Sequence, residues 1–223
     1  IKPENMEIIL RDAETGETRR PFPSGGAMYI AVSWSPDGRY LAAVKVMSNT
    51  KQDILLLDTQ TDSVLSLTDE GEETVYSIGP WLKESSGFYM VSHKEREFTG
   101  LALYRLDVNK WDWVETPEHD IEQVAMSKNG RVLVWAVNEG GASKLYGRDL
   151  QTGALLRMPD LPIGEVDVID VNPDGSRAAL NFTMPGEAAN LYEIDLKTGE
   201  MTALGQSMIG GIDLADMVTP EAI

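Results

Sequence analysis

Two short turn motifs alternate along the chain, and their spacing constrains the fold more than any other feature of the sequence. The first is a Ser-Pro-Asp-Gly-like turn between two apolar strands, as in "SWSPDGRYLAAV" at residues 33–44. Its copies carry turn glycines 49, 43 and 45 residues apart, at Gly38, Gly87, Gly130 and Gly175. Glycine supplies the positive φ that a tight turn between strands requires. The motif therefore predicts a repeated strand–turn–strand unit.

The second motif is an apolar strand that ends in Asp, followed by a short turn that often ends in Thr-Gly, and then another strand. "NLYEIDLKTGEMTA" at residues 190–203 is its clearest copy. The five Asp residues are separated by 46, 49, 42 and 46 residues, at Asp12, Asp58, Asp107, Asp149 and Asp195. An Asp side chain bonds its own backbone two residues on, and Gly takes the left-handed position, so this motif predicts a hairpin turn.

Together the two motifs predict four short antiparallel strands in every 45 residues or so, which is the signature of a β-propeller blade. The expected fold is all-β, a propeller with TolB/WD-like four-stranded blades and no helix longer than three turns between residues 25 and 205. A half-blade with only the two outer strands is expected at 6–22, and full blades at about 28–68, 74–116, 121–158 and 165–204. We expect these four and a half blades, residues 1–205, to be part of a larger ring, and 206–223 to be a linker.

Composition excludes several classes of function. The 223 residues carry a formal net charge of −17, which repels the phosphates of nucleic acids and anionic membranes. No apolar run approaches the 18 residues of a membrane-spanning helix. The absence of cysteine excludes disulfides and thiolate sites, and together with the expected truncation of the N-terminus it slightly favours the cytoplasm while leaving the compartment open. The first residues include neither an initiator Met nor a signal peptide, so we expect a truncated N-terminus.

No catalytic or metal-binding constellation is visible. His93 and His119 are the two histidines, and no G-x-S-x-G nucleophile elbow accompanies them. The acidic run 68–75 lacks the ligand spacing of a calcium loop. "WDW" at 111–113 places two tryptophans on one face of an outer strand, where packing against a neighbouring blade competes with ligand stacking. The sequence predicts no catalytic residue, no metal ligand and no cofactor.

The second half of the chain resembles the propeller of serine peptidases of the prolyl oligopeptidase family, and the nearest branch is the dipeptidyl aminopeptidase/acylaminoacyl-peptidase type. The phrases that carry the resemblance are "VNEGG" (137–141), "LPIGEV" (161–166) and the closing "GGIDLADMVTPEAI" (210–223). "REFTGLALYRLD" at 96–107 is also similar to a recurrent phrase of the family. The resemblance covers most of the chain.

The resemblance implies a non-catalytic domain. In this family an α/β-hydrolase domain with a Ser-Asp-His triad follows the propeller, and the propeller admits only small peptides to it. The partners implied are that hydrolase domain and passing peptides. Recognition is expected in the loops between second and third strands, at 47–52, 93–100, 138–142 and 183–189, because loops on a rigid scaffold usually carry it. The candidate substrate-gating residues are Arg96 and Glu97, as carboxylate fork and amine acceptor, with Asn138 and Glu139.

One alternative stays open from the residues themselves: an autonomous TolB-like or WD-type propeller that acts as a protein-interaction scaffold. Both interpretations predict blades, tight turns and an acidic surface. They differ at the C-terminus, because a scaffold should close its ring, whereas this chain is expected to continue into a linker. An arc of four and a half blades leaves unpaired strand edges and uncovered apolar faces at both ends, so we expect self-association unless a longer parent covers them.

Overall fold

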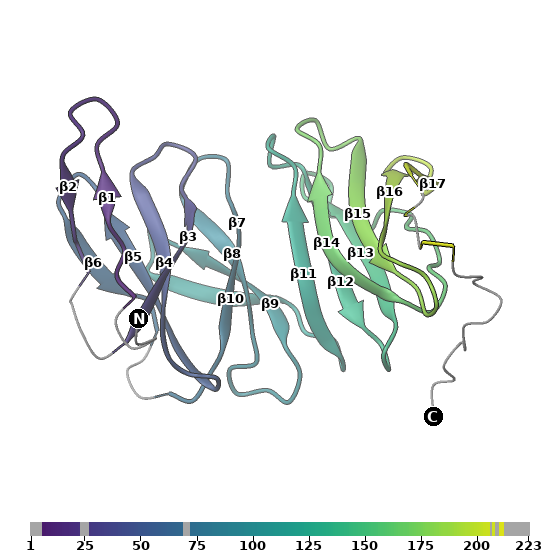
Figure 1. Ribbon diagram of the computed structural model, residues 1–223, viewed down its shortest axis with the longest axis horizontal. Coiled ribbons are helices and arrows are strands. Elements are labelled where there is room, and N and C mark those ends of the chain that lie inside the picture. The colour runs from purple at the N-terminus through teal and green to yellow at the C-terminus, as the bar shows by residue number, and fades with distance from the viewer. Residues whose placement is uncertain (1–5, 23–26, 69–71, 206, 208–209, 212–223) are drawn as a thin grey trace. The chain divides into compact units, whose positions relative to one another are not determined.

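The computed structural model describes residues 6–22, 27–68, 72–205, 207 and 210–211. The chain divides into two compact units, Ile1–Glu115 and Thr116–Ile223. Strands and turns make up both units (Figure 1). In the part of the chain just given there is no helix that could cross a membrane.

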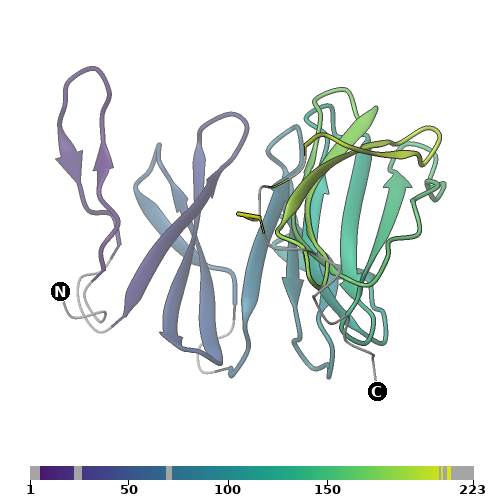
Figure 2. The ribbon, with the colours of Figure 1, turned by 45° about the vertical axis from the view of Figure 1, so that its right-hand side comes forward.

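The first unit contains a two-stranded and two four-stranded antiparallel sheets. The hairpin of β1 (Leu10–Arg11) and β2 (Thr18–Arg19) lies beside the first full sheet (Figures 1 and 2). That sheet has the order β3 (Met28–Trp34), β4 (Tyr40–Ser48), β5 (Lys51–Asp58) and β6 (Ser63–Ser66). The next has the order β7 (Tyr76–Trp81), β8 (Gly87–Ser92), β9 (Gly100–Arg105) and β10 (Lys110–Glu115).

The second unit contains two sheets built in the same way. One has the order β11 (Asp120–Met126), β12 (Val132–Asn138) and β13 (Ser143–Asp149). The other has the order β14 (Glu165–Val171), β15 (Arg177–Thr183), β16 (Asn190–Asp195) and β17 (Met201–Ala203). In every sheet each strand pairs with the next one in the chain, as expected for blades.

Alternating side chains bury both faces of the middle strands. In β4, Leu41 and Ala43 belong to the apolar cluster beneath the β1–β2 hairpin, whereas Ala42 belongs to the cluster between the first and second full sheets. Side chains alternate across a strand, so a middle strand between two neighbours must be apolar at nearly every position. Burial of Leu41, Ala42, Ala43 and Val44 below 8% exposure fits this rule. The fold is therefore all-β and made of propeller blades, as predicted.

The expectation of four strands in every full blade is wrong for the third. Its outermost segment contributes one isolated bridge, Arg148 to Leu155, and no strand. "LLRMPDLP" (155–162) contains two prolines, which cannot donate to a ladder, and little β-branched character. Leu156 and Met158 still pack on the apolar cluster of this unit, so the segment covers the sheet without pairing along it.

The turn motifs form as predicted in three blades, but the assignment of Gly87 as a turn glycine is wrong. Ser85 holds the left-handed position there, with φ 58°, and its N–H bonds the Leu82 carbonyl as Gly38 bonds that of Ser35. The turn position therefore recurs at residues 38, 85, 130 and 175. Gly87 begins β8, where the backbone of β9 leaves no room for a side chain.

The same blade departs from the second motif. Arg105, not Asp107, pairs with the first residue of the second strand, the place that Asp58, Asp149 and Asp195 hold in the other blades. The left-handed residue of this turn is Asn109. Asp107 lies two residues after Arg105, which holds the structural position. This offset explains why the spacings on either side of Asp107, 49 and 42 residues, differ from the spacing of 46 found elsewhere.

Candidate functional site

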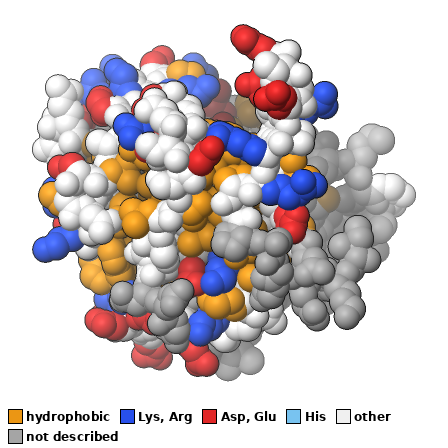
Figure 3. Space-filling view, turned by 90° about the vertical axis from the view of Figure 1, so that its left-hand side faces the viewer, with side chains coloured by type: hydrophobic (Ala, Val, Ile, Leu, Met, Phe, Trp, Pro, Cys, Tyr) orange, Lys and Arg blue, Asp and Glu red, His pale blue; other side chains and the backbone are white. Residues whose placement is uncertain are grey.

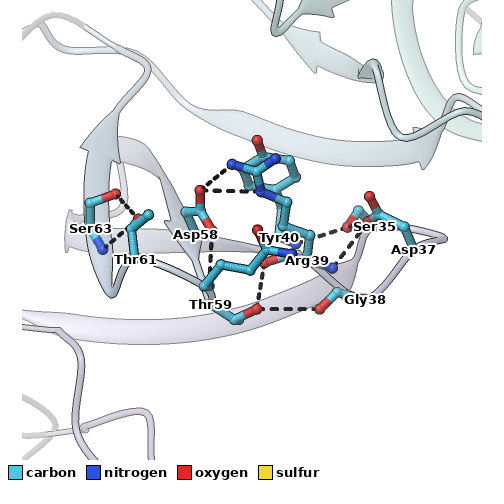
Figure 4. A network of polar contacts seen from close by, with 10 residues as sticks. Ser35, Asp37, Gly38, Arg39, Tyr40, Asp58, Thr59, Thr61 and Ser63 are labelled. Carbon is cyan, nitrogen blue, oxygen red and sulfur yellow. Dashed lines mark hydrogen bonds and ion pairs between the residues drawn. The ribbon is translucent and has the colours of Figure 1, made fainter.

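The turns at one end of the first full blade form a network of polar contacts (Figure 4). The Arg39 guanidinium forks onto one carboxylate oxygen of Asp58, with Nη2 at 2.7 Å and Nε at 3.2 Å. The Thr59 amide donates to the Arg39 carbonyl at 2.9 Å, and the Thr59 hydroxyl donates to the same carbonyl at 2.7 Å. The bond from Arg39 holds the pKa of Asp58 below its usual range. These contacts join the two turns into one rigid edge.

The third blade repeats this arrangement, with Arg131 Nε donating to Asp149 at 2.8 Å. The pKa of Asp149 is lowered first by the Thr152 amide and then by Arg131. Neighbouring blades are also linked through their turns: the Asp37 amide donates to Ser85 Oγ, and the Asn129 side chain donates to the Asp174 carbonyl. Arg39, Asp58, Arg131 and Asp149 are thus used in holding turns, so the motifs that reveal the fold have a structural role there.

The loop between β8 and β9 contains the candidates Arg96 and Glu97. The Arg96 guanidinium lies 5.6 Å from the ring centre of Trp113 on β10, and its Nε donates to the Phe98 carbonyl at 3.3 Å. Glu97 is exposed. Arg96 is thus packed onto an aromatic ring of its own blade, while Glu97 faces solvent. Their proposed contact with a peptide stays a prediction.

Both tryptophans of "WDW" pack, partly buried, on the apolar cluster between the two full blades of the first unit, and their rings meet edge to face at 4.9 Å. Lys94 lies over Trp111 at 5.7 Å and forms an ion pair with Glu72 at 3.0 Å. Glu72 also accepts the Tyr76 hydroxyl. Burial, with the charge of Glu72, raises the pKa of Tyr76 to about 12. Trp111 and Trp113 therefore pack against a neighbouring blade, which is one of the two roles expected for them.

Asn138 and Glu139, the candidates of the other unit, build the turn between β12 and β13. Asn138 Oδ1 accepts the Gly141 amide at 2.8 Å, and its Nδ2 donates to Glu122 at 2.9 Å. Glu139 accepts the Tyr146 hydroxyl at 2.6 Å and lies 3.3 Å from the Lys144 ammonium. The Tyr146 bond lowers the pKa of Glu139. These two candidates lie in the other unit from Arg96 and Glu97, and both serve their own turn.

The four loops differ in length more than the sequence indicated. The expected loop 47–52 is a two-residue turn at 49–50, because β4 and β5 extend into it. The others run from 93 to 99, from 139 to 142 and from 184 to 189. The first has no room for recognition residues, and the loop at 93–99 is the longest.

The innermost strands of the second unit carry two exposed carboxylates at equivalent positions. The first strand of each full sheet shifts register against the second, and in the second unit the extra residues at the shift are Glu122 and Asp167. Each accepts a hydrogen bond from the end of the next strand, Glu122 from Asn138 and Asp167 from Thr183. Both are exposed. Equivalent bulges thus place equivalent carboxylates on β11 and β14. The repeat predicts equivalent positions, but not a bulge.

The histidines and the acidic residues of the chain form no further cluster in the described part. Among residues 6–22, 27–68, 72–205, 207 and 210–211, no three His, Asp or Glu side chains gather closely enough to hold a metal ion. His93 follows β8, and His119 lies between β10 and β11, in the other unit. The expected linker 206–223 falls almost wholly outside the described residues.

A groove of about 820 Å³ lies between the β1–β2 hairpin and the sheet of β3–β6. Its apolar lining includes Ala31, Trp34 and Leu41 from the sheet and Ile9 and Leu10 from the hairpin. Trp34 is 49% exposed and Ile9 is 51% exposed, so two large apolar side chains of this groove are open to solvent. In Figure 3, apolar side chains gather on this side of the molecule, with charged groups around them.

The comparisons with known proteins support the fold. The structure of TolB from Acinetobacter baumannii matches with a TM-score of 0.63 and 15% identity, over 93% of this chain and 51% of that one. A structure from a study of two prolyl endopeptidases matches with a TM-score of 0.76 and 14% identity, over 92% and 31%. A puromycin-hydrolysing peptidase of Mycobacterium tuberculosis matches with a TM-score of 0.71 and 15% identity, over 91% and 33%.

These matches are similarities of fold at low identity. The chain spans about half of the TolB structure and about a third of the two peptidase structures. No family model matches the sequence. No curated protein matches it either.

Proposed function

We propose that the chain is the non-catalytic propeller part of a serine peptidase of the prolyl oligopeptidase family, and that it limits which peptides reach the active site of an α/β-hydrolase domain. The observation that carries the proposal is the difference between the share of this chain and the share of each peptidase that the structural match covers. More than 90% of the chain matches each of two peptidase structures with TM-scores of 0.71 and 0.76, yet covers only a third of them. The phrases at 137–141, 161–166 and 210–223 independently favour the same family.

Inner-strand carboxylates give this proposal a chemical basis. First strands lie nearest the axis of a propeller, so Glu122 and Asp167 would face a peptide that passes along it. A free peptide amino group is cationic, and fixed carboxylates raise its local concentration while excluding anions. The loop at 93–99 would contact the peptide or the hydrolase domain through Glu97.

The test uses the protein encoded by the complete reading frame. Rates of hydrolysis are measured for peptides of increasing length, each with a free and with an acetylated amino terminus. The proposal expects kcat/KM to fall steeply beyond a limiting length. It also expects the variant with both Glu122→Gln and Asp167→Asn to lose about two- to five-fold in kcat/KM on free-amine peptides at low salt, and little on acetylated ones. Arg96→Ala and Glu97→Ala test the loop: changes below about two-fold, roughly 0.4 kcal/mol, would exclude a substrate contact there.

A matched control is the 223-residue chain alone, which should be neither hydrolytic nor labelled by a serine-directed fluorophosphonate, since a serine without a positioned base is a poor nucleophile. Stoichiometric labelling of one of its serines would overturn the proposal.

The second candidate is an autonomous TolB-like scaffold that binds another protein. The TolB match supports it, because that match covers 93% of this chain. A complete reading frame whose product is not labelled by the fluorophosphonate would favour the scaffold over the peptidase.

A further inference from the structure

Two tryptophans occupy the same position in consecutive blades but have different surroundings. Trp34 pairs with Leu41, and Trp81 pairs with Phe88, at the last step between the first and second strands. Trp81 is 7% exposed, whereas Trp34 is 49% exposed. Equivalent backbone positions with such different exposure indicate that one of them lacks a neighbour that the other has.

The neighbour of Trp81 is the preceding blade. The Trp81 indole N–H donates to Ser33 Oγ at 3.0 Å, and the Tyr40 ring stacks on the indole with centroids 6.4 Å apart and planes at 9°. Ser33 and Tyr40 belong to the first and second strands of one hairpin, seven residues apart.

The second unit repeats this contact in apolar form. Val171 holds the position of the two tryptophans, is 4% exposed and shares a cluster with Ala125 and Val132 of the preceding sheet. Ala125 and Val132 are again seven residues apart, on the first and second strands. Trp81 in one unit and Val171 in the other are therefore each packed against the inner hairpin of the preceding blade.

Within the described residues, the sheet before Trp34 consists of β1 and β2 alone. β1 and β2 are joined by the Asp turn: the Asp12 carboxylate accepts the Glu14 and Thr15 amides, as Asp195 accepts those of Lys197 and Thr198. They are thus an outer pair. In complete blades the turn Asp lies opposite the first residue of the second strand, as Asp58 lies opposite Tyr40. Asp12 lines the groove of about 820 Å³.

The edge of β1 is able to extend the sheet. The Asp12 amide bonds the Glu17 carbonyl, toward β2. Because successive residues of a strand direct their amides to opposite edges, the amide of Arg11 faces the groove. Asp12 and Trp34 both line that groove, so one residue of an incoming strand would meet both, as Tyr40 meets Asp58 and Trp81.

We propose that this groove is the docking site of a two-stranded β-hairpin supplied by polypeptide outside these 223 residues. Its second strand pairs antiparallel with β1 and completes the sheet by β-augmentation. Trp34 determines which side chains the hairpin must carry. A small or hydroxyl side chain should contact the edge of the indole. Seven residues later, an aromatic or large apolar side chain should pack on the indole face and lie opposite Asp12. This inference does not depend on the proposed function.

The probe is a fluorescein-labelled synthetic peptide with the sequence of residues 27–48, which contains the Ser33–Tyr40 pair that covers Trp81. The inference expects saturable 1:1 binding to the full chain by fluorescence anisotropy, with slower hydrogen exchange of the amides at 9–11. Trp34→Ala in the chain should weaken binding at least ten-fold. A peptide with both Ser33→Ala and Tyr40→Ala should bind as weakly, which tests the site without altering the protein.

The matched control is Leu65→Ala, a large exposed side chain on the outer strand of the same blade, which should leave binding within two-fold. Lack of saturation, or equal binding by the Trp34→Ala chain, would overturn the inference. Sedimentation that shows a dimer in which exchange at 9–11 is already slow without peptide would also overturn it, because a second copy would then be the occupant.

Discussion

The backbone of Gly87 lies so close to the carbonyl of Tyr104 that a Cβ at residue 87 would be 2.1 Å from the carbonyl oxygen. Gly87 begins β8 and pairs with Arg105 on β9, so neither strand can move away without breaking its ladder. The glycine is required by this approach and not by a turn.

Gly87→Ala is therefore expected to lower the free energy of unfolding by roughly 3 kcal/mol or more, among the larger effects of single substitutions. Chemical denaturation measures it. Gly205→Ala is the control, since a Cβ there meets nothing within 4 Å, and its effect should stay below about 0.5 kcal/mol. Equal effects of the two substitutions would contradict the close approach.

Trp34 and Trp81 offer a comparison of one residue type at one blade position. Trp81→Ala removes a buried side chain that is bonded to Ser33 and stacked on Tyr40, and should destabilise the chain by about 3–5 kcal/mol. Trp34→Ala removes a half-exposed side chain and should cost about 1 kcal/mol or less. Thermal or urea unfolding measures the loss of stability for each variant. If Trp34→Ala lowers the free energy of unfolding as much as Trp81→Ala does, Trp34 is covered in solution.

Asp149 should make the protein more stable at neutral than at acid pH. Its folded pKa is lowered from 3.8 by the Thr152 amide and by Arg131, so the stability that it contributes is present above pH 3.8 and is lost as the pH falls through the folded pKa. Asp149→Asn should unfold at lower urea than the wild type at pH 7. The gap between the two midpoints should shrink at pH 3 and below. A gap that does not change with pH would show that the charge of Asp149 is not what stabilises the turn.

The stability that Tyr76 contributes should depend on pH in the opposite direction, with a loss at high pH. Burial, with the charge of Glu72, raises its folded pKa from 10.0 to about 12. The folded state therefore holds the phenolic proton more tightly than the unfolded state, and the resulting stability, present below pH 10, is lost as the pH rises from 10 to 12. Tyr76→Phe should lose less stability than the wild type over this interval, as followed by urea midpoints. Parallel curves for the two proteins would refute the shift.

The sequence by itself determined the repeat, the hairpins and the all-β fold, because these depend on local chemistry. An Asp that bonds amides two and three residues on, and a glycine at positive φ, act within a few residues and are visible in Asp195 and Gly199 without any knowledge of neighbours. For the same reason it erred where local chemistry varied: Ser85 replaces the turn glycine, and Arg105 the turn Asp, in one blade.

Tertiary structure decided how the side chains are used. Arg96, the candidate carboxylate fork, packs over Trp113, and Asn138 and Glu139 hydrogen-bond within and beside their own turn, while the contact of these candidates with a peptide stays a prediction. No spacing in the sequence distinguishes Trp34 from Trp81, because both precede a first-motif turn by one residue. Their difference arises from whether a hairpin of another blade lies against the indole. That contact joins residues far apart in the chain, and only the packing of one sheet on the next determines it.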